Sequence, residues 1–429
     1  MSSRSTLGAT FLNVMEQLII RGGRPLSGRI VAGGAKNAAL PACVAALLTD
    51  EPIILHRIPA LLDVATILAT ITSLGKRVIR DGDTVEIRGG PLLDGGPSAD
   101  YVKQMRASFI VLGPLLVRTG RANVDLPGGC NIGGRPVDFH LAGLAALGAT
   151  IEERCGVVVA TAGRLCGTRI VLPYPSVGAT QHLIMTAALA EGETVIANPS
   201  REPEVADLIS LLVKMGARIE TTPEGIRISG RDRLHGAEHT VIPDRLEVGT
   251  YLLAGAITGG EVEVGNAVPT ELAAFLDVLR ETGMEIVEGR NTVGLSSNGR
   301  PDPVRVRTAP HPGFPTDLHP PLTALLTLGR GESRIEETVF ERRFGYVPEL
   351  NRMGARIATT GDSAVIAGVK RLHSASVDAP DIRAGAALLL AGLAAEGKTV
   401  IHKIEQIDRG YAMIEEKLKA IGAQIEREP

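Results

Sequence analysis

Apolar and polar residues follow one repeating pattern along most of the chain. A helical run ends in an apolar residue and a glycine, and a strand with a polar turn follows, as in ALGATIEERCGVVVA and KMGARIETTPEGIRI. The pattern occurs six times, with its glycines 67 to 73 residues apart. Glycine is typical of a helix end, because the left-handed conformation there causes no Cβ clash. The six glycines are Gly75, Gly148, Gly216, Gly283, Gly354 and Gly422.

A second, more apolar helix is predicted upstream of each of these glycines. Helices that are apolar on nearly every side are expected to be buried. Short strand-like connections such as TVIAN and TVIHKI follow them, so the repeating unit is helix, strand, helix and hairpin. The six apolar segments are AALPACVAALL, ASFIVLGPLLV, TQHLIMTAALA, TYLLAGAI, PPLTALLTL and GAALLLAGLAA.

Six such units predict an α/β fold with three units in each half and the sheets packed outside a central helical bundle. A solenoid is the alternative, but solenoid repeats span about 20 to 50 residues and the period here is longer. We expect a flexible extension over 1–16 and one lobe over 36–242. The second lobe is expected to combine 17–35 with 243–429.

Composition and charge narrow the class of protein. The 429 residues are 44% hydrophobic and 22% charged, with a formal net charge of −3. Aromatic residues make up only 3% and Trp is absent, which argues against a base-stacking nucleic-acid surface. The apolar runs are too short to span a membrane, and the first fifteen residues lack the apolar core of a secretory signal. Four cysteines without a close pair, and scattered histidines, favour a cytoplasmic protein without a metal site.

Charged residues recur at equivalent places in the units, at the start of the apolar helix and in the link to the second helix. If the two lobes face each other, these residues meet in one cleft. Helix N-termini and guanidinium groups favour phosphates and carboxylates. Asp317, Asp381 and Asp408 are candidates for proton transfer among these bases. A solvated charged face is the alternative for any single arginine. The bases expected in the cleft are Lys36, Arg106, Arg135, Arg343, Arg383 and Arg409.

A glycine-rich segment with a lone cysteine, LPGGCNIGGRPVD, spans 126–138. Cys130 stands among four glycines, whereas Cys43 lies in the apolar run PACVAALL. An exposed thiol in a loop is able to react with a ligand. The segment leaves a reactive and a structural role for Cys130 equally open.

Ten segments together resemble the enolpyruvyl transferases, over 17–428. The related shikimate-pathway enzymes lack the cysteine loop, so the branch that acts on a uridine nucleotide sugar is the better match. The segments are GAKNAALP, MRAS, LPGGCNIGGRPVD, PSVGAT, REPE, PDRLEVGT, FPTD, ETVFERRF, DIRA and IDRGY.

The resemblance implies a fold of two inside-out α/β barrel lobes with three units each. It implies transfer of the enolpyruvyl group of phosphoenolpyruvate to the 3-hydroxyl of UDP-N-acetylglucosamine, with release of phosphate, at the start of peptidoglycan precursor synthesis. No metal or organic cofactor is implied. The chemistry requires a cleft that closes, because a cationic intermediate must be kept from water. Inactivation by the epoxide fosfomycin, which alkylates the loop cysteine of the family, is also implied for Cys130.

The resemblance also implies roles for individual residues. Cys130 matches the general acid and Asp317 the general base, with Lys36 and Arg409 completing the catalytic set. Phosphoenolpyruvate would be bound by Lys36, Asn37, Arg135 and Arg409. The nucleotide sugar would be bound by Asn37, Arg106, Arg135, Pro136, Val137, Asp138, Phe139, Ser176, Val177, Gly178, Asp317 and Val339. A supporting polar shell would consist of Glu204, Arg343, Asp381 and Arg383.

Some positions depart from the family pattern and make the acceptor uncertain. One alternative is a related enolpyruvyl transferase that acts on another nucleotide or nucleotide sugar. Another is a silent binding protein, although such a protein would not need both the acid and the base. The departures expected near the sugar and phosphate sites are Leu62, His319, Pro321, Arg342, Gly345 and Tyr346.

Overall fold

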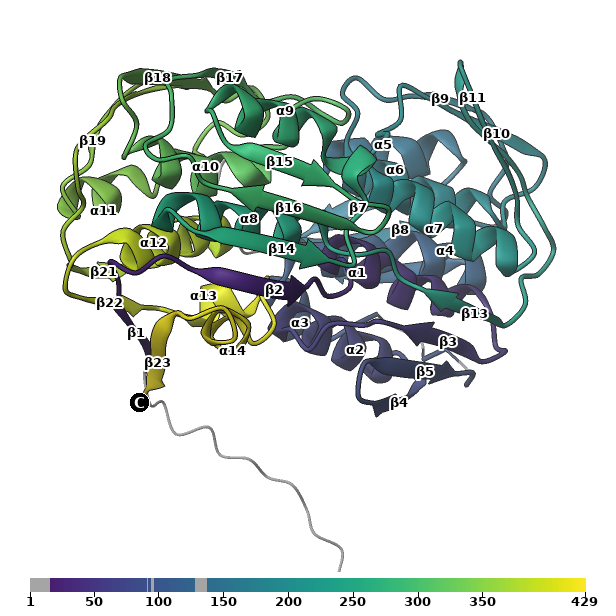
Figure 1. Cartoon of the computed structure of the whole chain (residues 1–429). Helices are drawn as coiled ribbons and strands as arrows, with labels where there is room; N and C mark the ends of the chain where they lie inside the picture. Colours follow the sequence, from purple (N-terminus) through teal and green to yellow (C-terminus); the bar gives the residue numbers. More distant parts are fainter. Residues whose placement is uncertain (1–15, 91, 94–95, 128–136) are drawn as a thin grey trace, which may run out of the picture.

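The computed structural model describes residues 16–90, 92–93, 96–127 and 137–429. Its strands form six separate sheets and its helices pack inside them, which gives an α/β fold (Figure 1). No closed barrel is formed by the strands of these residues. None of the helices in the same ranges has the length and apolar character needed to cross a bilayer.

Three sheets are built from the part of the chain between residues 53 and 240. Their strand orders are β13-β3-β5-β4, β6-β8-β7 and β11-β12-β10-β9. Each ends in an antiparallel hairpin, for example β7 with β8, which pairs Thr150 with Thr161. The strands are β3 (Ile53–His56), β4 (Arg77–Asp81), β5 (Thr84–Arg88), β6 (Arg121–Asp125), β7 (Thr150–Arg154), β8 (Val157–Thr161), β9 (Arg169–Val171), β10 (Glu193–Ala197), β11 (Arg218–Thr222), β12 (Gly225–Ser229) and β13 (Ala237–Thr240).

The other three sheets combine the first two strands with the last part of the chain. Their orders are β15-β16-β14-β2, β17-β18-β20-β19 and β21-β22-β1-β23. Strand β1 lies between β22 and β23, and Gln17 pairs with Glu428. The strands are β1 (Gln17–Arg21), β2 (Ser27–Val31), β14 (Glu261–Gly265), β15 (Glu285–Glu288), β16 (Thr292–Ser296), β17 (Arg305–Arg307), β18 (Glu332–Glu336), β19 (Arg356–Thr360), β20 (Ser363–Ala367), β21 (Ser376–Asp378), β22 (Lys398–His402) and β23 (Gln424–Glu428).

The six repeat glycines adopt the backbone conformation predicted for them. Their φ angles lie between 84° and 103°, and Gly148 and Gly422 both have φ of 103°. Each stands between the end of a helix and the start of a strand. In this region of φ a side chain with a Cβ is strained, which explains why glycine recurs there.

The helices differ in burial as their composition predicts. In α8 every residue except the last, Thr258, is buried, and α12 is buried over all but its last residue. The α-helices are α1 (Lys36–Ala45), α2 (Leu62–Ser73), α3 (Ala99–Gln104), α4 (Leu112–Thr119), α5 (Asp138–Ala146), α6 (Val177–Ala187), α7 (Pro203–Lys214), α8 (Arg245–Thr258), α9 (Ala273–Glu281), α10 (His319–Leu326), α11 (Val347–Arg352), α12 (Ile382–Ala394), α13 (Glu405–Asp408) and α14 (Ile414–Lys419). Four 3₁₀ turns are η1 (Ala46–Leu48), η2 (Arg106–Val111), η3 (Pro269–Leu272) and η4 (Thr316–Leu318).

Buried apolar residues form two clusters, and we call the part of the chain around each cluster a lobe. The first lobe has its core between Ala35 and Val241. The core of the second runs from Leu18 to Ala32 and from Leu246 to Ile425. The two lobes lie side by side, with the amino-terminal strands on the second one (Figure 1).

Two segments of chain cross between the lobes and run beside each other. Gly34 forms a β-bridge with Pro243, and the amide of Ala35 donates to the carbonyl of Ile242 over 2.8 Å. The amide of Asp244 donates in turn to the carbonyl of Gly33 over 2.9 Å. The lobes are therefore joined by a short, hydrogen-bonded double connection.

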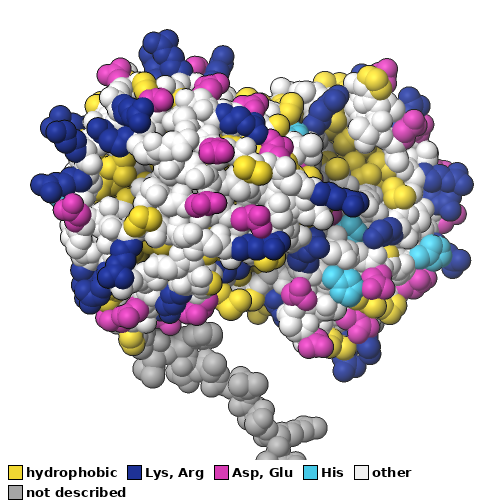
Figure 2. Space-filling view, in the orientation of Figure 1, with side chains coloured by type: hydrophobic (Ala, Val, Ile, Leu, Met, Phe, Trp, Pro, Cys, Tyr) yellow, Lys and Arg dark blue, Asp and Glu magenta, His cyan; other side chains and the backbone are white. Residues whose placement is uncertain are grey.

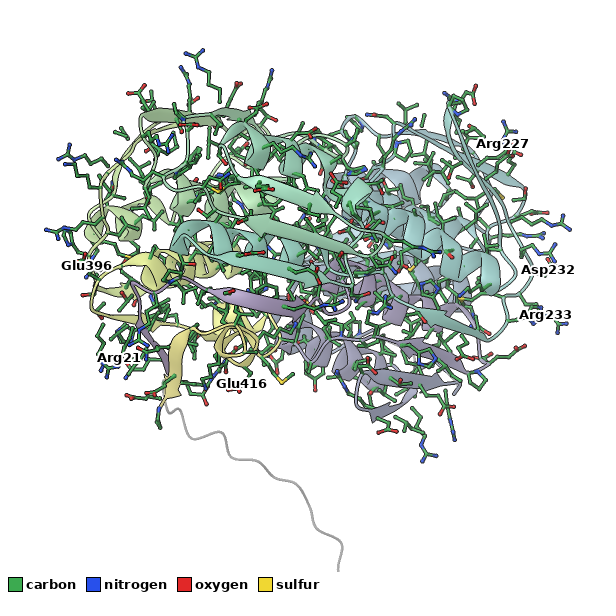
Figure 3. All side chains as sticks on the ribbon, viewed as in Figure 1. Arg21, Arg227, Asp232, Arg233, Glu396 and Glu416 are labelled. Atoms are coloured by element: carbon green, nitrogen blue, oxygen red, sulfur yellow. The ribbon has the colours of Figure 1, made fainter. Side chains whose placement is uncertain are left out.

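The outer surface carries charges of both signs. Lys and Arg side chains are interspersed with Asp and Glu over the visible face (Figure 2). Labelled side chains at the rim, such as Arg227 and Glu396, point away from the body of the molecule (Figure 3). This mixture agrees with the small net charge of −3.

Candidate functional site

A cavity of about 440 Å³ lies where the lobes face each other. Its lining comes from both lobes, and it includes residues at or beside the starts of α1, α6, η4 and α12. The residues that the sequence places in the site and the structure places in this lining are Lys36, Asn37, Arg106, Val137, Phe139, Ser176, Val177, Gly178, Glu204, Asp317, Val339, Arg343, Asp381, Arg383 and Arg409.

Some predicted site residues are not in this lining. Asp138 is exposed at the first position of α5 and does not line the cavity. Asp408 accepts two hydrogen bonds from Arg427, at 2.9 and 2.7 Å, so the expectation that it takes part in proton transfer in the cleft is wrong. The predicted residues Cys130, Arg135 and Pro136 lie outside the described residues.

The cavity lining is not as cationic as the sequence suggests. Within the described ranges it contains six Lys or Arg residues and five Asp or Glu residues. One of these carboxylates, Asp63, was not singled out by the repeat pattern. An anionic ligand must therefore compete with carboxylates of the protein for the same cations.

Asp63 joins two of the predicted cations. Its Oδ2 lies 3.1 Å from Nζ of Lys36, and its Oδ1 lies 2.8 Å from Nε of Arg409. The three side chains are at most 16% exposed. Lys36 and Asp63 belong to the first lobe, while Arg409 follows α13 in the second lobe, so this carboxylate also ties the lobes together. Sequence reasoning missed Asp63; its only signal is an acidic residue in the first turn of an otherwise apolar helix.

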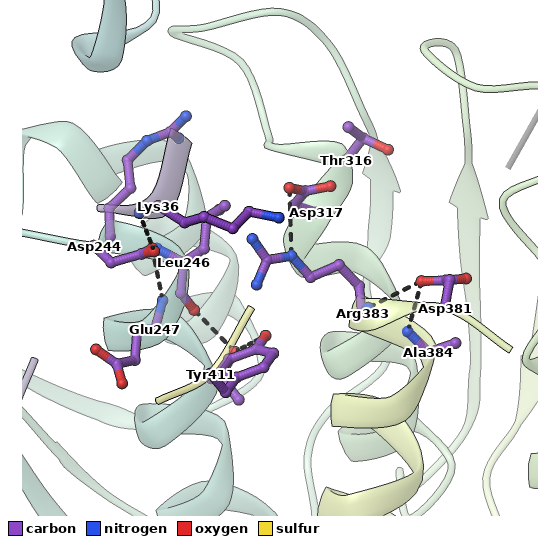
Figure 4. A network of polar contacts seen from close by, with 12 residues as sticks. Lys36, Asp244, Leu246, Glu247, Thr316, Asp317, Asp381, Arg383, Ala384 and Tyr411 are labelled. Carbon is purple, nitrogen blue, oxygen red and sulfur yellow. Dashed lines mark hydrogen bonds and ion pairs between the residues drawn. The ribbon is translucent and has the colours of Figure 1, made fainter. Parts of the chain in front are cut away.

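Asp317 is held by two buried arginines. Nη2 of Arg343 lies 2.5 Å from its Oδ1. Nε of Arg383 lies 3.4 Å from its Oδ2 (Figure 4). Burial opposes the charge of Arg383, but the neighbouring Tyr411, Asp317 and Asp244 outweigh this effect and raise its pKa. Two fixed cations favour the ionised form of Asp317, which is the form that accepts a proton.

Asp381 and Ser176 cap the helices that start at the cavity. Oδ1 of Asp381 accepts hydrogen bonds from the amides of Arg383 and Ala384, at 2.9 and 3.1 Å (Figure 4). Ser176 accepts one from the amide of Ala179 over 3.4 Å. These caps fix the first turns of α12 and α6 and so fix the side chains that those turns present.

A second interlobe contact lies at the start of α8. Arg245 forms ion pairs with Glu202 and with Glu204, the latter at 3.1 Å. The amide of His311 also donates to Glu202, over 3.1 Å. Burial raises the pKa of Glu202, and the nearby charges of Glu204 and Asp317 add to this effect although Arg245 opposes it.

Glu337 holds together the two turns that carry Asp317 and Val339. Its Oε1 accepts hydrogen bonds from the amides of Val339 and Phe340 at 2.6 and 2.9 Å, and its Oε2 accepts one from the hydroxyl of Thr316 at 2.8 Å. The amide of Val339 is thereby occupied by a protein acceptor. Sequence reasoning did not identify Glu337.

None of the six departures from the family pattern lines the cavity itself, although Leu62 and Arg342 directly precede the lining residues Asp63 and Arg343. His319 and Tyr346 are fully buried below Asp317, where the hydroxyl of Tyr346 lies 2.8 Å from that of Thr323. Burial and the nearby charge of Arg343 lower the pKa of His319 well below its ordinary value. His319 and Tyr346 therefore belong to the packing beneath the site, whereas Leu62, Arg342 and Gly345 are exposed. The described residues also contain no cluster of three His, Cys, Asp or Glu side chains that could hold a metal ion.

The fold and the site define a class of protein. The chain belongs to the EPSP synthase (3-phosphoshikimate 1-carboxyvinyltransferase) family, whose model matches residues 20–418.

Individual relatives carry a more specific name than the family model does. The chain is 51% identical over 426 residues to a protein of Azorhizobium caulinodans named UDP-N-acetylglucosamine 1-carboxyvinyltransferase, covering 96% of this chain and 99% of that one. A protein of the same name from Kosmotoga olearia is 49% identical, covering 97% and 100%. Among solved structures, the enolpyruvyl transferase NikO from Streptomyces tendae superposes with a TM-score of 0.87 at 28% identity, covering 96% and 99%.

Proposed function

We propose that this protein transfers the enolpyruvyl group of phosphoenolpyruvate to the 3-hydroxyl of UDP-N-acetylglucosamine and releases phosphate. This would be the first committed step of peptidoglycan precursor synthesis, carried out in the cytoplasm. The observation that carries the proposal is the pairing of a cation site, Lys36 with Arg409, and a fixed carboxylate, Asp317, in one interlobe cavity. Relatives about 50% identical over almost the whole chain support the choice of acceptor.

Phosphoenolpyruvate carries a phosphate and a carboxylate, and Lys36 and Arg409 present the charges that bind such groups. Asn37, the second residue of α1, lies beside Lys36 in the cavity lining. Arg135 is proposed as a further cation on the strength of the family resemblance. Because Asp63 already engages both Lys36 and Arg409, the bound dianion would share or replace its contacts.

Addition followed by elimination accounts for the reaction. The oxygen of the sugar 3-hydroxyl bonds to the carbon of phosphoenolpyruvate that bears the phosphate, while the methylene carbon takes a proton. Phosphate then leaves with its bonding electrons, and the new methyl group loses a proton to restore the double bond. Asp317 is proposed to accept the hydroxyl proton, and Cys130 to supply the proton to carbon as general acid.

The nucleotide sugar is proposed to lie along the part of the cavity lined by Arg106, Phe139 and the first turn of α6. Arg135, Pro136, Val137 and Asp138 are assigned to it from the resemblance. The buried shell of Glu204, Arg343, Asp381 and Arg383 would hold the reacting groups in place. At the level of architecture, we regard each lobe as one inside-out barrel of three sheets around buried helices.

Phosphate release tests the proposal directly. The full chain is mixed with phosphoenolpyruvate alone and with phosphoenolpyruvate plus UDP-N-acetylglucosamine, UDP-glucose or 3-phosphoshikimate. Turnover only with UDP-N-acetylglucosamine supports the proposal, and identification of a 3-enolpyruvyl ether in the product completes it. Turnover confined to another acceptor, or none with any of them, would overturn it.

A further inference from the structure

Two histidines form a pair in the wall of the cavity. Nδ1 of His140 on α5 lies 3.0 Å from Nδ1 of His182 on α6, and their ring centroids are 5.1 Å apart. His140 lines the cavity, whereas His182 is fully buried behind it. Phe109 packs edge-on against both rings, with centroids 5.7 and 6.3 Å away. The proposed reaction does not use this pair.

The backbone determines which nitrogen of His182 carries the proton. The amide of Gly113 donates to Nε2 of His182 over 2.6 Å, so Nε2 is an unprotonated acceptor. Burial, followed by the nearby His140, lowers the pKa of His182 well below its ordinary value and keeps its ring neutral. The single proton of His182 is therefore on Nδ1, which faces Nδ1 of His140.

The same reasoning extends to His140. Because His182 donates from Nδ1, Nδ1 of His140 must accept, and its proton is on Nε2. A second proton on His140 would place two N–H groups against each other at 3.0 Å. The charged residues on the elements that pack against α6 are Arg106, Arg118, Asp138, Glu193, Glu204, Asp207, Lys214 and Arg227, and those on β7, which packs against α5, are Glu152, Glu153 and Arg154.

Two glycines, Gly113 and Gly178, leave space for the two histidine rings. A Cβ at position 113 would lie 2.6 Å from Nε2 of His182 and 2.0 Å from the hydroxyl of Thr186. A Cβ at position 178 would lie 3.4 Å from Nε2 of His140. The Nε2 edge of His140 therefore rests against the first turn of α6, where Ser176, Val177 and Gly178 line the cavity.

We propose that His182 is a positioning residue that holds His140 as a neutral imidazole with its N–H on Nε2. This donor would lie in the wall beside the first turn of α6 and serve an acceptor oxygen of the nucleotide sugar. The tautomer assignment stands on the hydrogen bonds and the burial of His182, while its use in binding rests on the proposed function. A buried hydrogen-bond partner often determines which ring nitrogen of a ligand-facing histidine is protonated, and it thereby orients the ring.

Nitrogen-15 NMR of the full chain, labelled at histidine, tests the tautomer without any ligand. His140→Gln and His182→Gln identify the two sets of signals. At pH 7 we expect a protonated-type shift for Nε2 of His140 and for Nδ1 of His182, and an unprotonated-type shift for the other nitrogen of each ring. Protonation of His140 on Nδ1, or of both nitrogens of His182, would overturn the proposal.

Kinetics test the positioning role. His182→Leu removes both hydrogen-bonding groups, whereas His182→Gln can keep an acceptor and a donor. We expect the Leu variant to raise the KM for UDP-N-acetylglucosamine roughly tenfold, the change expected for one hydrogen bond, with the Gln variant closer to wild type. The ratio of Leu-variant to wild-type KM should also change between pH 6 and pH 8, because His140 is then free to take a second proton. A ratio that stays constant with pH would contradict the positioning role.

His239→Gln is the matched control. His239 is also buried in the first lobe and pairs with Asp207 over 2.9 Å, but it does not line the cavity. We expect this variant to leave the signals of His140 and the pH dependence of KM unchanged. If wild type shows no turnover with the two substrates, the proposed function fails, while the NMR result still decides the tautomer.

Discussion

Replacing Asp63 with asparagine removes one charge from a buried group of three. Each of its contacts, at 3.1 Å to Lys36 and 2.8 Å to Arg409, joins a carboxylate to a cation that is largely shielded from water. At about 3 Å and an effective dielectric of about 20, each carries roughly 5 kcal/mol of Coulomb attraction, most of which the lost hydration offsets. Leaving two partly buried cations uncompensated is expected to cost about 3 kcal/mol.

The predicted stability change of Asp63→Asn is measurable by calorimetry. For 429 residues, about 2.1 cal/mol/K of unfolding entropy per residue converts 3 kcal/mol into a Tm lower by about 3 °C. The matched control is Asp50→Asn. Asp50 also pairs with an arginine and a lysine, Arg118 at 2.8 Å and Lys76 at 3.5 Å, but it is 64% exposed. Its removal should cost less than about 1 kcal/mol.

The same substitution should strengthen anion binding. Without the competing carboxylate, Lys36 and Arg409 are both available to a dianion, and we expect phosphate and phosphoenolpyruvate to bind at least about tenfold more tightly. Isothermal titration of each anion into the two variants and wild type measures this. Unchanged or weaker binding to Asp63→Asn than to wild type would refute the competition of Asp63 with the ligand. Equal stability losses in the two variants would refute the predicted cost of the buried charges.

Three further predictions concern the two proton-transferring groups and one buried histidine. Fosfomycin should inactivate the wild-type protein, whereas Cys130→Asp should retain part of the activity and resist alkylation; an inactivation rate unchanged in the variant, measured by residual turnover and mass spectrometry, would refute the role of Cys130. Asp317→Asn should lower kcat by about 10² to 10⁴ and change the KM for the nucleotide sugar little, because the amide retains the shape but not the basicity of the carboxylate; a full kcat in steady-state assays would exclude it as the base. His319 has a lowered pKa when folded, so its contribution to stability is present above about pH 6.5 and is lost as pH falls below that value, by up to about 1.4 kcal/mol per pH unit. Denaturant unfolding of His319→Gln should show a shallower fall in stability between pH 6.5 and pH 5, and parallel curves would show that His319 does not titrate on unfolding.

The sequence was sufficient to predict the repeating elements and much of the cavity lining. Glycines such as Gly148 stop a helix by a local rule, and the burial of α8 and α12 follows from their composition. The starts of α1 and α12 recur at equivalent places of the repeat, so the repeat pattern by itself groups their polar residues. Local patterns of this kind can be predicted from the sequence because their causes lie within a few residues.

Partners that meet across the lobes could not be predicted in this way. Asp63 contacts Arg409, which stands 346 positions away in the chain, and only the packing of the lobes brings them together. The burial of individual residues could not be predicted either. His319 and Tyr346 follow cavity residues in the sequence, yet they lie in the layer beneath them. A single sequence gives the periodicity of an element but not which of its polar residues find a buried partner.

The pairing of Gln17 with Glu428 means that the described chain begins and ends on neighbouring strands. A short peptide linker could join these ends, and new termini could be opened at the exposed turn of Gly82 between β4 and β5. Such a circular permutant should retain the cavity, because neither the new junction nor the new break touches its lining. Conversely, deletion of the last strand, β23, would expose one edge of β1, and this edge could then pair with a strand of another molecule.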